Sequence, residues 1–251
     1  MRRVFSGFLA LGVVTLAAST ATAQQPPAQQ PPPMTNLQLY PKDIPRPQLL
    51  TTMQGFVQAL GVQASGGCGY CHAGTAPAFD FASDTKPAKT VARKMILMSR
   101  DITAKLPEVT GKPASDVASL RCATCHRGVA IPKLLPDILT ETATKSGTPA
   151  AIQQYRELRA KYYGGQSYDF SENGIVAMAT TLNNANKPDD ALAWLQVNAE
   201  FYPKSAATYG AMAQSYQRKE DKANAIKSLE KAVELDPNNQ AMKRQLDQLK
   251  R

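Results

Sequence analysis

Beyond residue 18 the sequence contains no apolar stretch long enough to span a bilayer, so we expect no transmembrane segment in the mature chain. It also lacks a run of basic residues, which argues against binding to nucleic acid in a chain that we expect to be exported. Histidine and cysteine are scarce: the 251 residues include only two histidines and four cysteines. Any chemistry that depends on histidine or cysteine therefore uses some of these six side chains.

The amino terminus has the three parts of a cleavable secretory signal. Arg2 and Arg3 are positively charged, residues 5–18 are almost entirely apolar, and the small-residue sequence ATA ends at Ala23. This order predicts a signal peptide over residues 1–23 and a periplasmic location in a bacterium. Residues 24–43 begin with QQPPAQQPPP, a composition that cannot bury a core, and they predict a flexible linker rich in proline and glutamine.

Positive charge is concentrated in one part of the chain. Residues 24–136 contain 12 lysines and arginines against 6 acidic residues, whereas residues 137–251 contain 15 against 14. An excess of this kind steers acidic partners toward a protein, but it equally serves to balance bound anions. Composition leaves both interpretations open.

All four cysteines and both histidines belong to two copies of one pentapeptide, CGYCH at residues 68–72 and CATCH at residues 122–126. A redox dithiol of the thioredoxin type would need an alternating strand and helix pattern, which is absent, and a four-cysteine zinc site would leave both histidines unexplained. Covalent haem attachment explains all five positions, since two thiols bond to the porphyrin and the adjacent imidazole reaches the iron. We predict two covalently bound c-type haems, with disulfides or zinc as alternatives. The predicted attachment residues are Cys68, Cys71, Cys122 and Cys125, and the predicted iron ligands are His72 and His126.

Each predicted haem needs a ligand on its other face, and the chain has no third histidine. Methionine is the usual remaining choice. Apolar residues at helical spacing predict helices over residues 48–61 and 87–106, one before each motif. The first carries Met53, which is our candidate for the first iron. The second carries Met95 and Met98, which lie three residues apart, and only one of them is needed for the second iron.

The segments TVARKMILMSRDI and RCATCHRGVAIP resemble the cytochrome subunit of purple-bacterial photosynthetic reaction centres, over roughly residues 36–135. In that family a methionine-bearing helix precedes each Cys-x-x-Cys-His motif, and the helix–motif units pair about a local two-fold axis. The resemblance implies Met53 for the first iron and Met95 for the second, with Met98 as second choice. The family subunit generally carries four haems, whereas this chain can attach two and resembles its first half. A photosynthetic and a respiratory role are both left open.

Residues 137–251 follow a different pattern. Pro203 and Pro237 lie 34 residues apart, which is the tetratricopeptide period, and predict repeats over residues 172–205 and 206–239. Further helices are expected at residues 150–163 and 239–251, and Trp194 is expected in the core between repeats. We therefore predict a mainly α fold, with a di-haem cytochrome c domain with few strands over residues 44–136 and a short helical solenoid over residues 137–251. The solenoid would either dock a partner protein or stabilise the haem domain.

Two classes of function compete at this stage. The first is an exported electron-transfer protein, not an enzyme, that works between periplasmic or membrane-bound redox partners. The alternative is a di-haem redox enzyme such as a peroxidase, which needs one open haem site. A scaffold that works mainly through its repeats is a third possibility. A methionine helix before each motif, with no spare histidine or acidic cluster, favours electron transfer.

Overall fold

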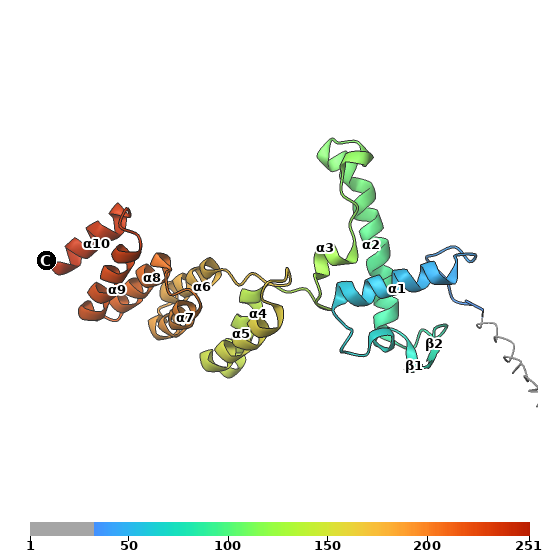
Figure 1. Ribbon diagram of the computed structural model, residues 1–251, viewed down its shortest axis with the longest axis horizontal. Coiled ribbons are helices and arrows are strands. Elements are labelled where there is room, and N and C mark those ends of the chain that lie inside the picture. Colours follow the sequence, from blue (N-terminus) through green and yellow to red (C-terminus); the bar gives the residue numbers. More distant parts are fainter. Residues whose placement is uncertain (1–32) are drawn as a thin grey trace, which may run out of the picture. The chain divides into compact units, whose positions relative to one another are not determined.

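The computed structural model describes residues 33–251; the predicted signal peptide and the first part of the predicted linker lie outside this range. Within it the chain forms ten α-helices, two 3₁₀ turns and one two-stranded sheet (Figure 1). The expectation of a mainly α protein with few strands is confirmed. None of the helices in the described range has both the length and the hydrophobicity that a bilayer crossing requires.

Two helices precede the cysteine motifs, as predicted. Helix α1 (Arg46–Leu60) starts at a proline-rich turn and ends at Gly61, which adopts the left-handed conformation that glycine favours. Helix α2 (Pro87–Thr110) begins with a proline in its first turn and ends at Gly111. It runs four residues past the predicted end at residue 106, because Pro107 lies inside the last turns and removes only one backbone hydrogen bond there.

The segments between these helices are short and tight. The 3₁₀ turn η1 (Gly67–Tyr70) is followed by strands β1 (Ala73–Thr75) and β2 (Ala78–Asp80), which pair antiparallel. A second 3₁₀ turn, η2 (Ala114–Asp116), leads to the five-residue helix α3 (Cys122–His126). Each cysteine motif therefore lies on a single turn of helix.

The remaining residues are almost entirely helical. Most neighbouring helices along this segment pack against each other, which is the arrangement of a helical repeat array. The sequence did not predict α4, and the proposed domain boundary at residue 136 falls in its first turn; that boundary stays a prediction. The elements are α4 (Leu135–Ser146), α5 (Thr148–Tyr162), α6 (Glu172–Asn184), α7 (Pro188–Phe201), α8 (Ala206–Arg218), α9 (Lys222–Leu235) and α10 (Gln240–Lys250).

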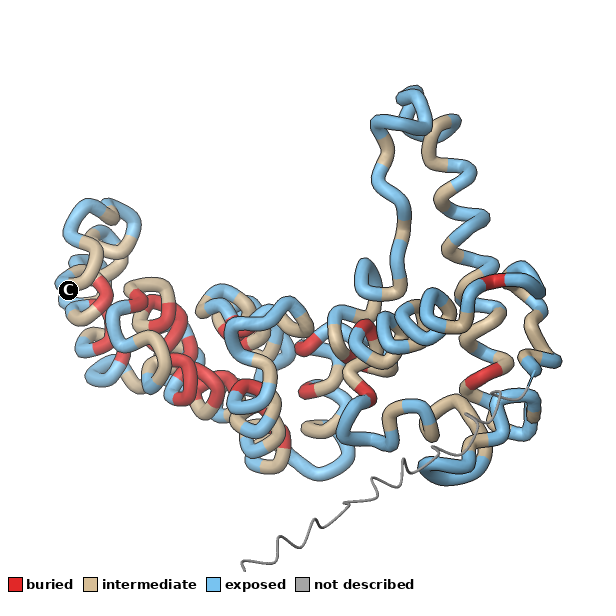
Figure 2. Tube along the Cα trace, turned by 45° about the vertical axis from the view of Figure 1, so that its right-hand side comes forward, coloured by how far each residue is buried: buried red, intermediate tan, exposed pale blue. Residues whose placement is uncertain are grey.

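Buried residues of the described chain gather mainly in these later helices (Figure 2). Positions expected to be small in the second repeat are fully buried, as at Ala213 and Ala225. Trp194 is 1% exposed, which confirms a core role, but it packs edge-on against Tyr155 of α5 and so contacts the helices before the repeats. Asn198 of α7 is fully buried and donates to the Thr208 hydroxyl at 2.8 Å.

Candidate functional site

The first motif gathers its three functional side chains through one turn of helix. Cys71 and His72 follow Cys68 by three and four residues, so all three lie on the same side of the turn. The backbone N–H of His72 donates to the carbonyl oxygen of Cys68 at 2.9 Å, which closes the turn. Cys68 is exposed, whereas Cys71 is half-buried and its burial raises the pKa of the thiol.

His72 is half-buried. Its ring meets Phe81 edge-on at 5.0 Å between centroids, and its Nδ1 is buried without a hydrogen-bond partner among the described residues. Burial lowers the pKa of His72, and the positive charges of Lys89 and Arg93 lower it further. The imidazole is therefore held in the neutral form, which is the form that binds a metal.

The second motif repeats this local geometry on α3. The Thr124 hydroxyl accepts a hydrogen bond from the backbone N–H of Arg121 at 3.1 Å and so fixes the start of the turn. His126 Nδ1 lies 3.0 Å from the carbonyl oxygen of Val129. A carbonyl can only accept, so Nδ1 carries the proton and the Nε2 lone pair is free for a metal. Burial raises the pKa of the Cys122 thiol, as it does at Cys71.

The end of α1 connects the two motifs. The carbonyl of Val62, just after α1, accepts from the backbone N–H of Gly67 at 2.9 Å, at the start of the first motif. The carbonyl of Ala59, inside α1, accepts from Gly128 at 2.9 Å, directly after the second motif. A Cβ atom at Gly61 would lie 1.9 Å from the carbonyl oxygen of Gly128, so only glycine permits this close approach.

Helix α2 and the lysine that precedes it also connect the two motifs. Near its start, Lys86 Nζ donates to the carbonyl oxygen of Gly69 in the first motif at 2.7 Å. Farther along, the Thr103 hydroxyl accepts from the backbone N–H of Leu120 at 3.1 Å, two residues before the second motif. Each long helix, together with the residues that directly flank it, therefore hydrogen-bonds to backbone in or next to both motifs.

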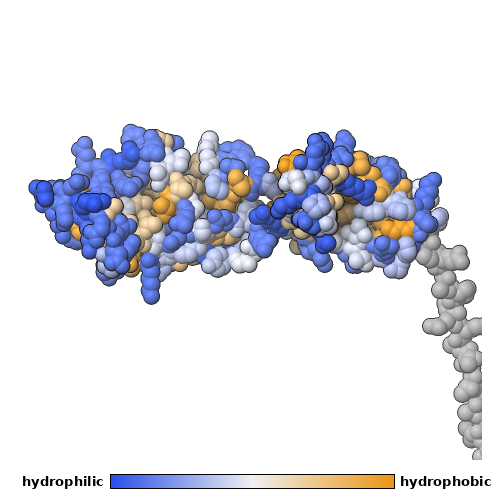
Figure 3. Space-filling model, turned by 90° about the horizontal axis from the view of Figure 1, so that it is seen from above, coloured by the Kyte–Doolittle hydropathy of each residue, from blue (hydrophilic) through white to orange (hydrophobic). Residues whose placement is uncertain are grey.

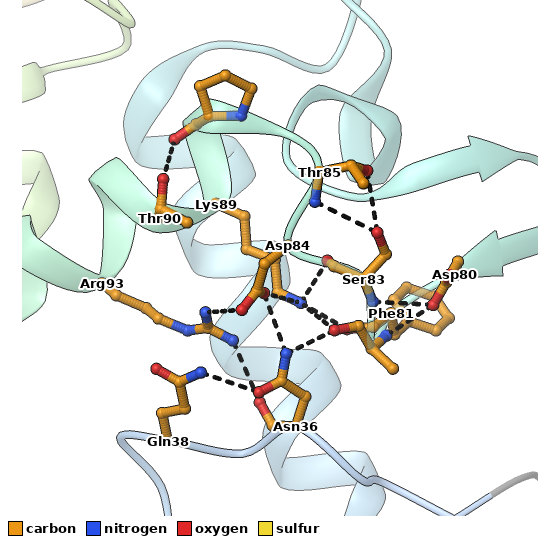
Figure 4. A network of polar contacts seen from close by, with 12 residues as sticks. Asn36, Gln38, Asp80, Phe81, Ser83, Asp84, Thr85, Lys89, Thr90 and Arg93 are labelled. Carbon is orange, nitrogen blue, oxygen red and sulfur yellow. Dashed lines mark hydrogen bonds and ion pairs between the residues drawn. The ribbon is translucent and has the colours of Figure 1, made fainter.

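A polar network that sequence reasoning missed holds the loop before α2 (Figure 4). Lys89 is only 8% exposed; its Nζ donates to the carbonyls of Phe81, Ala82 and Ser83 and pairs with Asp84 at 2.9 Å. Arg93 pairs with the same carboxylate at 2.8 Å, and Asn36 donates to it at 3.0 Å. These contacts hold the pKa of Asp84 well below its usual range. The sequence offered one signal for this network: Lys89 and Arg93 are spaced one helical turn apart, so they lie on the same side of the helix.

The predicted methionine ligands lie on these two helices. Met53 is half-buried on α1, whereas Met95 and Met98 on α2 are 43% and 49% exposed. They belong to an apolar row at helical spacing whose other members, Val91 and Ile102, are also exposed. Figure 3 shows hydrophobic areas exposed on the molecular surface among hydrophilic ones. A long apolar face that the protein leaves uncovered suits contact with a large apolar group such as a porphyrin.

The donor sets of the two motifs fit haem. All four cysteines are free thiols. Within residues 33–251 no three side chains from histidine, cysteine, aspartate or glutamate are grouped so as to hold a single metal ion. Each motif offers two thiols and one imidazole on one turn, and α2 in the same segment has an exposed apolar face.

These features are those of a c-type cytochrome, an electron carrier with covalently attached haem. The sequence matches the photosynthetic reaction centre cytochrome c subunit family over residues 12–189, which is more than half of the chain, and the protein belongs to that family. Residues 206–239 match the tetratricopeptide repeat, a unit associated with protein–protein interaction. The family favours electron transfer over catalysis.

A curated relative supports the assignment over a limited region. Cytochrome c-554 of Chloroflexus aurantiacus is 40% identical over 80 residues, which is 32% of this chain and 17% of that protein. The chain thus aligns with about a sixth of the relative. The family match is wider than the predicted similarity over residues 36–135, because it continues through α4, α5 and α6.

Proposed function

We propose that the protein is an exported di-haem cytochrome that carries electrons between periplasmic or membrane-bound redox partners. The observation that carries the proposal is the pair of Cys-x-x-Cys-His turns, each presenting two thiols and an imidazole, with α1, α2 or the residues directly flanking them hydrogen-bonded to backbone in or beside both turns. Family membership supports covalent haem, and the two motifs support a stoichiometry of two.

In the proposed first site, Cys68 and Cys71 attach the porphyrin, and His72 and Met53 are the iron ligands. Burial lowers the pKa of His72, and the positive charges of Lys89 and Arg93 lower it further. The neutral imidazole that results is ready to bind without first losing a proton.

In the proposed second site, Cys122 and Cys125 attach the porphyrin, His126 is one ligand and Met95 the other, with Met98 as second choice. The Val129 carbonyl holds His126 in one ring orientation and tautomer at 3.0 Å. A hydrogen bond of this kind orients the ligand and increases its basicity.

When bound, each haem supplies an iron that alternates between the ferric and ferrous states. The protein would supply one histidine and one methionine to each iron, so that no ligand position would be left for a substrate. Methionine sulfur is a soft ligand that stabilises the reduced state. Because α1 and α2 are tied to both turns, little rearrangement should accompany a change of charge, which favours fast electron exchange.

Mass spectrometry and optical spectroscopy of the mature protein test the proposal. The expected mass is that of the chain starting at Gln24 plus two haem groups that resist acid–organic extraction. The oxidised spectrum should show two low-spin haems with the thioether–iron charge-transfer band. A bare polypeptide mass would contradict the proposal. One high-spin haem in the resting protein would instead support a redox enzyme with an open site.

A further inference from the structure

The two motifs differ in how they meet solvent. Of the seven residues 67–73 around the first motif, only Cys68 is exposed, whereas five of the equivalent residues 121–127 are exposed around the second. The second motif lies on the short helix α3 (Figure 1). Its turn therefore presents more of its surface to an approaching protein.

The cationic side chains near the two motifs differ in whether they are paired within the protein. Near the first motif, Lys86 is bound to a backbone carbonyl, while buried Lys89 and Arg93 pair with Asp84. These cations are occupied by the protein's own oxygens, and Asp84 cancels part of their charge. They are poorly placed to attract a partner.

The second motif is flanked by two arginines, Arg121 and Arg127, both exposed. Neither guanidinium forms an ion pair with a carboxylate anywhere in residues 33–251. Arg127 reaches back over the same turn, where its Nε lies 3.5 Å from the carbonyl oxygen of Thr124. Two uncompensated charges thus lie at the ends of one exposed helical turn.

We propose that this surface, residues 121–127, is the docking site for an acidic redox protein, and that electrons pass to or from the partner at the second haem. The inference rests on the proposed function, because it requires a haem at Cys122 and Cys125. Exposed charges of one sign raise the rate of encounter with a partner of the opposite sign and orient it on arrival. Arginine also forms paired hydrogen bonds with carboxylates, which suits an acidic protein surface.

The test uses the mature full-length holoprotein, reduced and then mixed with hexacyanoferrate(III), an anionic oxidant. The test variant is Arg121→Glu/Arg127→Glu, and Arg121→Gln/Arg127→Gln removes the charge without reversing it. The control is Lys227→Glu/Arg244→Glu, which makes the same change in net charge at exposed, unpaired positions of α9 and α10. Mass and optical spectra establish first that each protein carries two low-spin haems.

At an ionic strength of about 10 mM, where the Debye length is about 30 Å, the oxidation rate of the Glu variant should be about tenfold lower than that of the wild type. The Gln variant should be intermediate, the control should stay within about twofold, and all rates should converge near 1 M salt. With the cationic oxidant tris(phenanthroline)cobalt(III) the order should reverse. Poly-L-glutamate, as a soluble acidic polypeptide, should slow oxidation of the wild type but not of the Glu variant.

Equal loss in the control variant would overturn the proposal, because net charge alone would then explain the rates. It would also be overturned if phosphatidylglycerol vesicles bound through the two arginines while poly-L-glutamate had no effect, since the surface would then recognise a lipid headgroup. If the wild type lacks a second haem, the proposed function fails. If both haems are present and the arginines do not affect the rates, only the docking site fails.

Discussion

The close approach of α1 to the second motif gives a sharp test of how the two motifs are held together. Gly61 has φ +64°, and alanine in this left-handed conformation costs about 1 kcal/mol relative to glycine. The added Cβ would also lie 1.9 Å from the carbonyl oxygen of Gly128, so the two backbones must separate. Separation sacrifices the hydrogen bond from Gly128 to Ala59, worth about 1 kcal/mol. Gly61→Ala should therefore lower the free energy of unfolding by about 2–3 kcal/mol.

Gly111→Ala is the matched control. Gly111 has φ +66° and also ends a helix, but a Cβ there would meet nothing within 4 Å. It should cost only the conformational strain, about 1 kcal/mol. Urea unfolding followed by haem absorbance measures both variants, and haem content is determined in parallel. Equal losses in the two variants would refute the view that the Gly61–Gly128 contact holds α1 against the second motif.

Three further predictions address the ligand, the polar network and the repeat core. Met95→Ala should make one haem high-spin or water-ligated and lower its potential, while Met98→Ala should leave both optical spectra nearly unchanged; the opposite pattern would assign the ligand to Met98. Since its partners lower the pKa of Asp84, this carboxylate stabilises the fold above its unfolded pKa of about 3.9 and loses that effect as the pH falls through the folded value. Asp84→Asn should therefore reduce stability at pH 7 and flatten its decline below about pH 4 in urea titrations; an unchanged acid limb would contradict this. Buried Arg159 donates to the Phe170 carbonyl and the Tyr202 hydroxyl, both at 3.1 Å. Arg159→Leu should therefore lower the free energy of unfolding, followed by circular dichroism, by about 3 kcal/mol and leave the haem spectra unchanged. A loss near zero would show that these two hydrogen bonds do not stabilise the fold.

Local signals in the sequence were sufficient for much of the fold. Gly61 ends α1 where its left-handed preference predicted, and the proline spacing of 34 residues placed the repeat that matches residues 206–239. Helix α4 was missed because its sequence is rich in threonine, which has low helix propensity, and its apolar contacts are made with other helices. Packing between elements overrides local preference there.

The candidate site was likewise predictable only where it depends on local sequence. Cysteine and histidine spacing identifies the two attachment turns, because both residue types are scarce and the turn geometry is local. The contact of Gly61 with Gly128 joins segments 67 residues apart, and the Asn36–Asp84 contact joins segments 48 residues apart. Spacing along the chain carries no information about such contacts. The assignment of Met95 over Met98 likewise depends on the family resemblance and stays a prediction.

The contacts of α1 and α2 also connect the two helix–motif units to each other. In sequence the order is helix, motif, helix, motif. In space α1 returns to the second motif through Ala59 and Gly128, and α2 begins at the first motif through Lys86 and Gly69. Each helix–motif unit therefore satisfies backbone groups of the other. Because backbone beside each motif is held from the other unit, disruption of one motif should also weaken haem attachment at the other.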